Sequence, residues 1–353
     1  MVVDDLVKHP GAWLSTENDA GIVISSRVRL ARNIRGIAFP GWAGEDECVK
    51  VCRKLRDACK EVPALANALF MEVARLSPVE KEVLKERHLI SSEFAERGPG
   101  SGLVVTGNER IAIMINEEDH LRLQAISPGM NLLAVWEQID AVDSELGEHV
   151  EYAFSPSLGY LTACPSNVGT GLRASVMIHM PGLRLMGEIE QVTKALTRMC
   201  FAVRGLQGEG SDAYGNMFQI SNQSTLGENE KDIIDRMIRI VDEVVRQERN
   251  ARARLLENRR PFVVDQVGRS FGILTHAGLM PSMEAVDLLS MLKLGVDLGL
   301  VRNLTAAAIH EIILLTQPGH MQKIAGKIVD AQERDEMRAR MVKDKLRGVS
   351  LSR

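Results

Sequence analysis

Residues 21–257 contain two kinds of segment. In some, apolar residues recur at every second position, and in others they recur with the period of a helix. Residues 21–33 place Ile22, Ile24 and Val28 between polar neighbours, which predicts a strand. Further runs of strand character lie at residues 103–106, 111–115, 120–125, 174–180, 201–203 and 217–222. Amphipathic helices are predicted over residues 45–60, 130–146, 188–198 and 227–257.

Another helix is predicted to begin at Ser77. Pro78 suits a first helical turn, and Glu80 completes a capping box with Ser77. We expect this helix to carry His88. Between two predicted strands, the acidic residues 117–119 form the connection of a hairpin. Such hairpins make much of the predicted sheet antiparallel.

The pattern changes after a break at residues 258–261, which read Asn-Arg-Arg-Pro. From Ser282 onward the pattern is helical, over residues 284–300, 306–316, 320–327 and 331–346. We therefore predict an α+β domain over residues 21–257, with a largely antiparallel sheet flanked by helices. A lead-in of residues 1–20, docked to the core by Trp13, precedes it, and an all-helical domain of residues 258–353 follows it.

Composition excludes several classes of function. The 353 residues carry a formal net charge of −4, which gives no basic field for nucleic acid. No apolar run is long enough to span a membrane, and no signal-peptide pattern follows Met1. The five cysteines are scattered, without metal-ligand spacing, and Cys48, Cys52 and Cys59 lie on one predicted helix. We expect free thiols and a cytoplasmic location.

Candidate chemistry centres on residues 164–175, which read CPSNVGTGLRAS. Gly169 and Gly171 let the backbone approach a ligand, and the loop delivers Arg173 onto a strand. Arg27 and Arg29 are two residues apart, so on a strand both project from one face. Arginine meets phosphate with a rigid fork, so this pattern favours a phosphate site, although an ordinary turn with a surface arginine is the alternative.

Four segments resemble motifs of the phosphagen (guanidino) kinases, in the same order. They are ISSRVRLARN, NEEDHLRLQ, CPSNVGTGLRAS and RGLQGEG. The resemblance implies the fold of that superfamily and phosphoryl transfer from Mg·ATP, with Mg²⁺ held by ATP and no metal ligand from protein side chains. It implies ATP-binding residues Ser25, Ser26, Arg27, Val28, Arg29, His88, Arg122, Arg173, Ala174, Ser175, Val176, Met177, Arg204, Gly205, Leu206, Gln207, Gly208 and Glu209.

The guanidinium group that accepts the phosphoryl group in these kinases gives the carboxylates a role. A guanidinium has a pKa above roughly 12, so it must be oriented and relieved of a proton before it attacks phosphorus. The resemblance assigns this role to Glu118 and Glu209, and Glu117 is a neighbour that could take it instead. It also places a reactive thiol at Cys164. Neither a Walker loop nor the protein-kinase HRD and DFG motifs are present.

Two departures narrow the resemblance to the bacterial protein arginine kinases. Small-molecule guanidino kinases carry a helical domain before the first motif, whereas 24 residues precede Ser25 here, so we expect an open acceptor site that suits an arginine on a protein. The segment RDEMRA resembles an allosteric pocket for phosphoarginine in that family. Its residues are Arg334, Asp335, Glu336, Met337, Arg338 and Ala339. The alternative is a solvated charged helix face.

The resemblance thus implies an ATP-dependent protein arginine kinase that marks proteins for degradation and regulates a heat-shock repressor. It further implies a homodimer, an activator protein, and a protease or chaperone partner, with no nucleic acid or membrane partner. One alternative is a kinase for free arginine or another small guanidino compound. A second is a phosphoarginine-binding adaptor with an inactive kinase domain, which the retained arginines and glutamates argue against.

Overall fold

A computed structural model gives the fold and describes residues 2–14, 21–205 and 213–352. Within these residues the main sheet has the strand order β2-β3-β4-β5-β1-β8-β10-β9, and every neighbouring pair is antiparallel. The predicted antiparallel sheet is therefore confirmed. Its strands are β1 (Val23–Arg32), β2 (Leu69–Glu72), β3 (Gly102–Val105), β4 (Ile111–Ile115), β5 (Leu121–Pro128), β8 (Leu172–His179), β9 (Phe201–Gly205) and β10 (Met217–Asn222).

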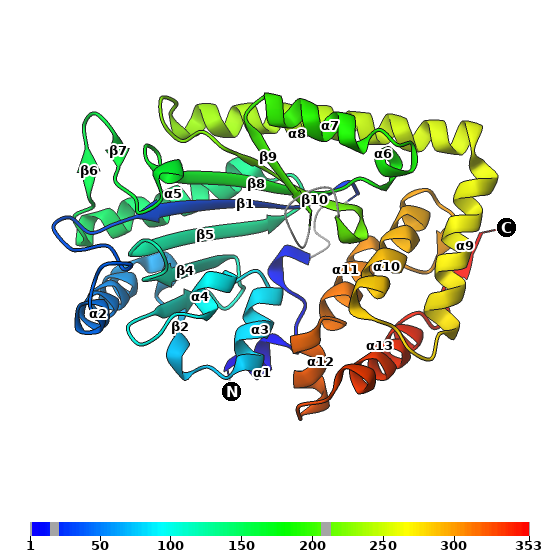
Figure 1. Cartoon of the computed structure of the whole chain (residues 1–353), viewed down its shortest axis with the longest axis horizontal. Coiled ribbons are helices and arrows are strands. Elements are labelled where there is room, and N and C mark those ends of the chain that lie inside the picture. Colours follow the sequence, from blue (N-terminus) through cyan, green and yellow to red (C-terminus); the bar gives the residue numbers. More distant parts are fainter. Residues whose placement is uncertain (1, 15–20, 206–212, 353) are drawn as a thin grey trace.

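The two faces of the central strands differ in chemistry. Val28, Leu123 and Val176 are fully buried on one face, beneath α5 (Leu132–His149) and α8 (Glu230–Asn258). Because side chains alternate along a strand, Arg27 and Arg29 project from the opposite face. Figure 1 shows α8 running along this part of the sheet.

Three of the remaining helices of the sheet domain are predicted by the sequence pattern, at residues 45–60, after Ser77 and at residues 188–198, and the shorter elements are not. The remaining α-helices of this domain are α2 (Glu45–Glu61), α3 (Pro78–Glu86), α4 (Ser92–Ala95), α6 (Pro181–Leu185) and α7 (Ile189–Arg198). A short hairpin joins β6 (Phe154–Ser155) to β7 (Gly159–Tyr160). Single helical turns are η2 (Pro63–Leu65), η3 (Val73–Arg75), η4 (Pro165–Asn167) and η5 (Tyr214–Asn216).

The predicted capping box of α3 is confirmed, but the helix does not carry His88. Ser77 accepts from the Glu80 backbone while the Glu80 side chain accepts from the Ser77 backbone. The helix ends at Glu86, and His88 follows with φ 59°. The amides of His88 and Leu89 bond back to the carbonyls of the last turn at 2.9 Å each, which is a Schellman end with histidine in the left-handed position.

The C-terminal region is helical and begins directly after α8. It contains α9 (Arg260–His276), α10 (Ser282–Asp297), α11 (Ala306–Leu315), α12 (Pro318–Ala325) and α13 (Ala331–Lys345). A pair of short strands, β11 (Val301–Arg302) and β12 (Ser350–Leu351), departs from the all-helical expectation. The break at residues 258–261 is real, yet it is only a bend, because α9 starts at once.

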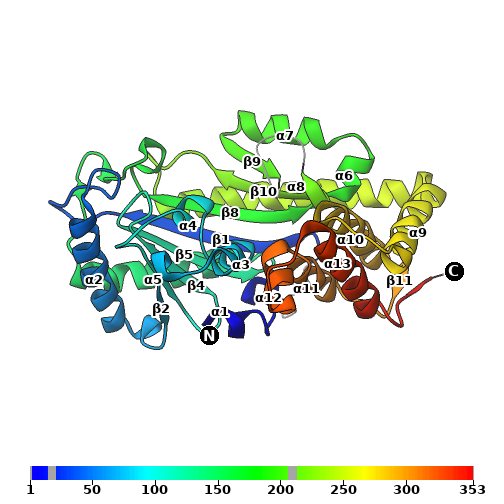
Figure 2. The same cartoon turned by 60° about the horizontal axis from the view of Figure 1, so that its bottom comes forward.

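The helical region packs against the sheet domain through a shared core. Its apolar cluster includes Ile24 of β1 and Met217 of β10. Between α3 and α12, the Glu86 carboxylate accepts from the amides of Gly319 and His320 at 2.6 and 3.0 Å. Figure 2 shows α12 beside α3 and α10–α13 gathered at one end of the sheet.

The N-terminal lead-in lies over the junction between the two regions. It contains α1 (Val2–Leu6) and η1 (Ala12–Leu14). The Trp13 ring lies 4.9 Å from the His88 ring and packs against the core of the helical region. The predicted docking of the lead-in by Trp13 is therefore confirmed.

Candidate functional site

Four arginines form a row on the open face of β5, β1 and β8, and we call Arg27, Arg29, Arg122 and Arg173 the arginine row. Arg29 and Arg173 are direct partners across β1 and β8, and Arg122 on β5 is opposite Ala31, two residues further along β1. Like charges directly opposite one another destabilise a sheet. This arrangement therefore costs stability unless an anion lies over the row.

The pKa values of the arginines in the row agree with this cost in stability. Burial, together with the charges of Arg122 and Arg173, lowers the pKa of Arg27 from 12.5 to about 10. Burial and the charges of Arg27, Arg122 and Arg173 lower the pKa of Arg29 well below its ordinary value. The Nε atoms of Arg29 and Arg173 are buried without a hydrogen-bond partner in the described residues. Both features suit a group of donors that binds an anion.

The protein partners of the row are mostly neutral. Arg27 donates from Nη2 to Gln219 Oε1 at 2.7 Å and from Nε to Ser175 Oγ at 3.4 Å. Arg173 donates from Nη2 to Ser221 Oγ at 3.1 Å. Hydroxyl and amide groups orient these guanidiniums without cancelling their charge. Sequence reasoning missed Gln219 and Ser221, although both alternate onto the open face of the predicted strand at 217–222.

The connection between β4 and β5 holds the acidic residues in place. Asn116 has φ 62°, and its Nδ2 donates to the carbonyls of Cys48 and Gly100 at 2.8 and 2.7 Å. On the other side, Asp119 accepts from the Ala163 amide at 2.7 Å and from Asn33. Glu117 and Glu118 lie between these anchors, in the predicted hairpin connection, which is confirmed.

The two glutamates have different partners. The side chain of Glu117 is 3% exposed, pairs with Arg122, and accepts from the Ser91 hydroxyl. Burial alone would lower the pKa of Arg122, but the charge of Glu117 raises it. Glu118 accepts from Asn167 Nδ2 at 3.1 Å, and burial raises its pKa although Arg122 opposes the shift. Glu117 thus orients Arg122, while the carboxylate of Glu118 can still accept a hydrogen bond or a proton.

The glycine-rich loop brings Cys164 and Asn167 to the same place. Gly169 has φ 115°, and a Cβ there would lie 2.1 Å from the Thr225 carbonyl oxygen. Gly171 has φ 66°, and a Cβ there would lie 2.6 Å from the Ala31 carbonyl oxygen of β1. Only glycine fits either position. The Cys164 Sγ lies 3.0 Å from the Ser166 hydroxyl and is partly exposed.

Two cavities lie along the open face. The first, which we call the acceptor cavity, has a volume of about 630 Å³ and is lined by Arg29, Glu117, Glu118, Arg122, Cys164, Asn167, Arg173 and Arg204, among others. The second, the interdomain cavity, has a volume of about 520 Å³ and is lined by Ser25, Arg27, His88, Ser175 and Met177 together with residues of the lead-in and helical region. The structure therefore divides Glu118, Cys164 and nine of the predicted ATP-binding residues between two spaces.

Some predicted ATP-binding residues do not present side chains to either cavity. Val28, Ala174 and Val176 belong to the core on the covered face of the sheet, and Ser26 is buried and donates to the Gly129 carbonyl at 2.8 Å. Gly205 ends β9. The remaining predicted positions, Leu206, Gln207, Gly208 and the second carboxylate Glu209, lie outside the described residues.

The RDEMRA segment lies on α13, and its arginines are engaged by backbone. Arg338 is 1% exposed, donates to the carbonyls of Thr316 and Met280 at 2.7 Å each, and pairs with Asp335. Arg334 donates to the Val329 carbonyl at 2.7 Å. Glu336 is exposed, Met337 is partly buried and Ala339 is buried. Arg338 is therefore not part of a solvated face; it joins α13 to the residues flanking α10 and α11.

In the part of the chain that the structure describes, no group of three or more His, Cys, Asp or Glu side chains could hold a metal ion. None of the described helices is long and apolar enough to cross a membrane.

Comparisons with known proteins agree with this geometry. The family described as ATP:guanido phosphotransferase, C-terminal catalytic domain, matches residues 50–251, and the protein-arginine kinase McsB C-terminal domain matches residues 260–353. A protein-arginine kinase of Halothermothrix orenii is 43% identical over 348 residues, covering 98% of this chain and 99% of the relative. The chain belongs to the protein-arginine kinase family.

Other members and neighbours of this family support the assignment. A protein-arginine kinase of Geobacillus stearothermophilus is 43% identical, covering 95% of this chain and 93% of the relative. The crystal structure of a lombricine kinase superposes with a TM-score of 0.59 at 26% identity, covering 71% of this chain and 76% of that one. A taurocyamine kinase from Schistosoma mansoni has the same TM-score at 24% identity, covering 76% of this chain and 42% of that one, which shows the shared fold. The predicted phosphagen-kinase-like fold is thus confirmed.

Proposed function

We propose that this chain transfers the γ-phosphoryl group of ATP to the guanidinium groups of arginine residues in proteins. The observation that carries the proposal is the arginine row, whose positive charge is only partly compensated, by Glu117 at Arg122, and which lies beside the carboxylate of Glu118. Membership of the protein-arginine kinase family supports a protein as the acceptor.

The arginine row serves the nucleotide. Its guanidiniums bind the phosphate oxygens and stabilise the charge that spreads over the transferred group in a metaphosphate-like transition state. The row is assembled on adjacent strands, so the donors are oriented before the reaction starts. Mg²⁺ is held by the phosphates of ATP in this proposal, where it supplies charge neutralisation at the β and γ oxygens.

Glu118 serves the acceptor. Its free oxygen atom accepts a hydrogen bond from the substrate guanidinium, orients one nitrogen toward the γ-phosphorus, and takes the proton that this nitrogen loses. The N–P bond forms as the bond between the γ-phosphorus and the bridging oxygen breaks, and ADP leaves with that electron pair. Glu209, which lies outside the described residues, is proposed as the second carboxylate on the guanidinium.

A matched pair of variants tests this assignment. Glu118→Gln should lower kcat by about 10²-fold or more, with the Kd of ATP largely kept, because a general base is lost. Glu117→Gln should instead weaken ATP binding, because the partner that orients Arg122 is lost. Substrate choice is tested by incubating the wild type with ATP and either free arginine or an intact protein, followed by acid-free mass spectrometry. Equal kcat in the two glutamate variants would contradict the division of roles.

We also propose that the face of α13 around Arg334 and Asp335 binds phosphoarginine and regulates the kinase. Arg338 is a poor site for the test, because its removal would leave two buried carbonyls unpaired. Arg334 is only partly buried, so Arg334→Ala should abolish stimulation by added phosphoarginine while basal turnover persists. Unchanged stimulation would remove Arg334 from the regulatory proposal. The homodimer, the activator, the protease or chaperone partner, the repressor and the cytoplasmic location remain predictions from the resemblance.

A further inference from the structure

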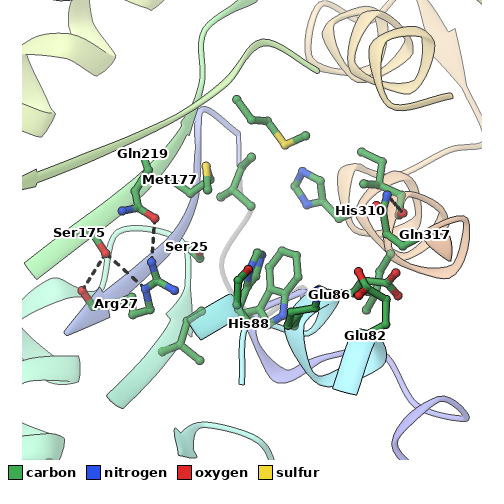
Figure 3. Close-up of a pocket in the computed structure, with 18 residues that line it drawn as sticks. Ser25, Arg27, Glu82, Glu86, His88, Ser175, Met177, Gln219, His310 and Gln317 are labelled. Carbon is green, nitrogen blue, oxygen red and sulfur yellow. Dashed lines mark hydrogen bonds and ion pairs between the residues drawn. The ribbon is translucent and has the colours of Figure 1, made fainter. Parts of the chain in front are cut away.

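The interdomain cavity has walls from different parts of the chain. Strands β1, β8 and β10 supply one wall with Arg27, Met177 and Gln219. The lead-in and the region of α11 supply the other, with Trp13, His310, Ile313, Leu314 and Gln317. Figure 3 shows Arg27, Met177 and Gln219 facing His310 and Gln317 across the space, with His88 between them. The volume of about 520 Å³ suits a small-molecule ligand.

Neighbouring positions on the same strands line the two cavities. Arg27 lines the interdomain cavity, and Arg29, two residues along the same face of β1, lines the acceptor cavity. Two residues of strand advance by roughly 7 Å, which is comparable to the reach of a polyphosphate. A nucleotide whose phosphates follow the arginine row from the acceptor cavity therefore places its nucleoside in the interdomain cavity.

The walls of the interdomain cavity suit a flat, weakly polar ring. Apolar side chains line both sides, Ile24, Ile126, Met177 and Met217 on one and Ile313 and Leu314 on the other, and the charged Glu82, Lys85 and Glu86 also line the cavity. The left-handed conformation of His88 turns its imidazole against Trp13, with ring centroids 4.9 Å apart and an interplanar angle of 54°. Aromatic and sulfur-containing side chains of this kind pack well against a heteroaromatic ring.

His310 is the unexplained polar group of this cavity. It is 4% exposed, and its Nε2 atom has no hydrogen-bond partner in the described residues. Burial and the charge of Lys293 lower its pKa to about 3, so the ring is neutral at pH 7 and carries one donor and one acceptor. Such a group costs free energy when buried unpaired, and a ligand that satisfies it is favoured.

We propose that the helical region completes the nucleobase subsite, with His310 and Gln317 contacting the purine of ATP and selecting it over other bases. This inference rests on the proposed function, since it takes the arginine row to be the phosphate site. Gln317 lies just after α11 and donates from Nε2 to the Ile313 carbonyl at 2.9 Å, which orients its amide oxygen for a base edge. The selection of the nucleotide then depends on the helical region, although the sheet carries the residues that perform the reaction.

The test compares three ligands on the intact chain by isothermal titration calorimetry: ATP, GTP and inorganic tripolyphosphate. His310→Leu should raise the Kd of ATP about tenfold, because one buried hydrogen bond to the base is lost. Gln317→Ala should change the ratio of the ATP and GTP Kd values by at least about threefold. Neither variant should change the Kd of tripolyphosphate, which lacks a base. His310→Gln should recover part of the affinity for ATP.

Glu311→Gln is the matched control. Glu311 lies next to His310 on α11 but pairs with Lys345 at 2.9 Å, outside the interdomain cavity, so its loss should change none of the three Kd values. A purely structural role of His310 would weaken ATP and tripolyphosphate together, and that result would overturn the inference. The inference would also be overturned if the Kd values of the His310 and Gln317 variants for ATP and GTP stayed within twofold of those of the wild type. If His310→Leu fails to fold, His310→Gln and Gln317→Ala carry the same comparison. A wild type that binds neither ATP nor tripolyphosphate would instead refute the arginine row as the phosphate site, and with it the proposed function.

Discussion

Removing a charge from the arginine row should make the ligand-free protein more stable while it damages nucleotide binding. Arg27→Gln is the chosen substitution, because glutamine keeps a polar side chain next to Gln219 and Ser175. Stability and nucleotide binding place opposite demands on Arg27. Its charge contributes to binding an anion, but it lowers the stability of the ligand-free protein.

The magnitude follows from the pKa of Arg27. A fall from 12.5 to about 10 means that the charged side chain costs the folded state roughly 3 kcal/mol, at about 1.4 kcal/mol for each tenfold change in the constant. At pH 7 the side chain is protonated in both folded and unfolded chains, so this cost is fully present, and it fades only as pH rises toward 10 and beyond. Solvent screening and the lost hydrogen bonds to Gln219 and Ser175 reduce the expected gain to about 1–2 kcal/mol.

Urea unfolding of the ligand-free protein measures the gain, and calorimetry with ATP measures the loss. Arg27→Gln should raise the urea midpoint without changing the m-value. It should also raise the Kd of ATP by about 10–100-fold, because one charge-assisted contact is removed. ATP should therefore shift the melting temperature of the variant much less than that of the wild type.

Arg32→Gln is the control on the same strand. Arg32 is also buried, but it pairs with Asp143 at 2.7 Å and donates to the Thr170 carbonyl at 2.9 Å. Its removal leaves a buried carboxylate unpaired and should cost about 3–5 kcal/mol. If Arg27→Gln lowers stability as Arg32→Gln does, or leaves the Kd of ATP within threefold, the account of the arginine row is wrong.

Two further predictions concern the chemistry of the site. Because burial raises the pKa of Glu118 above its ordinary 4.5, the acid limb of the kcat/KM profile should have its midpoint above that value, and activity should fall as pH drops through it. Asn167→Ala removes a hydrogen bond that favours the carboxylate, so it should move this midpoint further up, whereas an unmoved midpoint would show that another group titrates. Arg173→Lys keeps the charge but loses the planar fork, and we expect at least about a tenfold loss in ATP affinity or kcat. A lysine variant with the wild-type Kd and kcat would show that charge alone suffices at Arg173.

Short-range periodicity was enough to predict most elements and the orientation of the arginines. The alternation along β1 places Arg27 and Arg29 on one face whatever the neighbouring strands are, so this part of the site follows from local geometry. The sequence pattern does not predict α9, because Pro261 lies within the break that it indicates at residues 258–261. Proline is tolerated in the first turn of a helix, where its missing N–H leaves no bond unmade, and that is its position here.

The features of the site that the sequence does not predict depend on contacts between segments that are far apart in the chain. Glu117 and Glu118 are equivalent in the sequence, and only the positions of Ser91, Arg122 and Asn167 distinguish them. No local pattern indicates that His310 meets Met177 across a cavity, because the two residues belong to different parts of the chain. The left-handed conformation of His88 was likewise unpredictable, since glycine is the usual residue at that position.

The central place of β1 has a consequence for the synthesis of the chain on the ribosome. This strand emerges first, yet it lies between β5, which begins at Leu121, and β8, which ends at His179. At roughly 5–20 residues per second, β1 waits on the order of ten seconds for these partners. A strand without partners invites pairing with other nascent chains, and charges along it oppose such aggregation. We therefore expect Arg27 and Arg29 to reduce such pairing before any nucleotide binds.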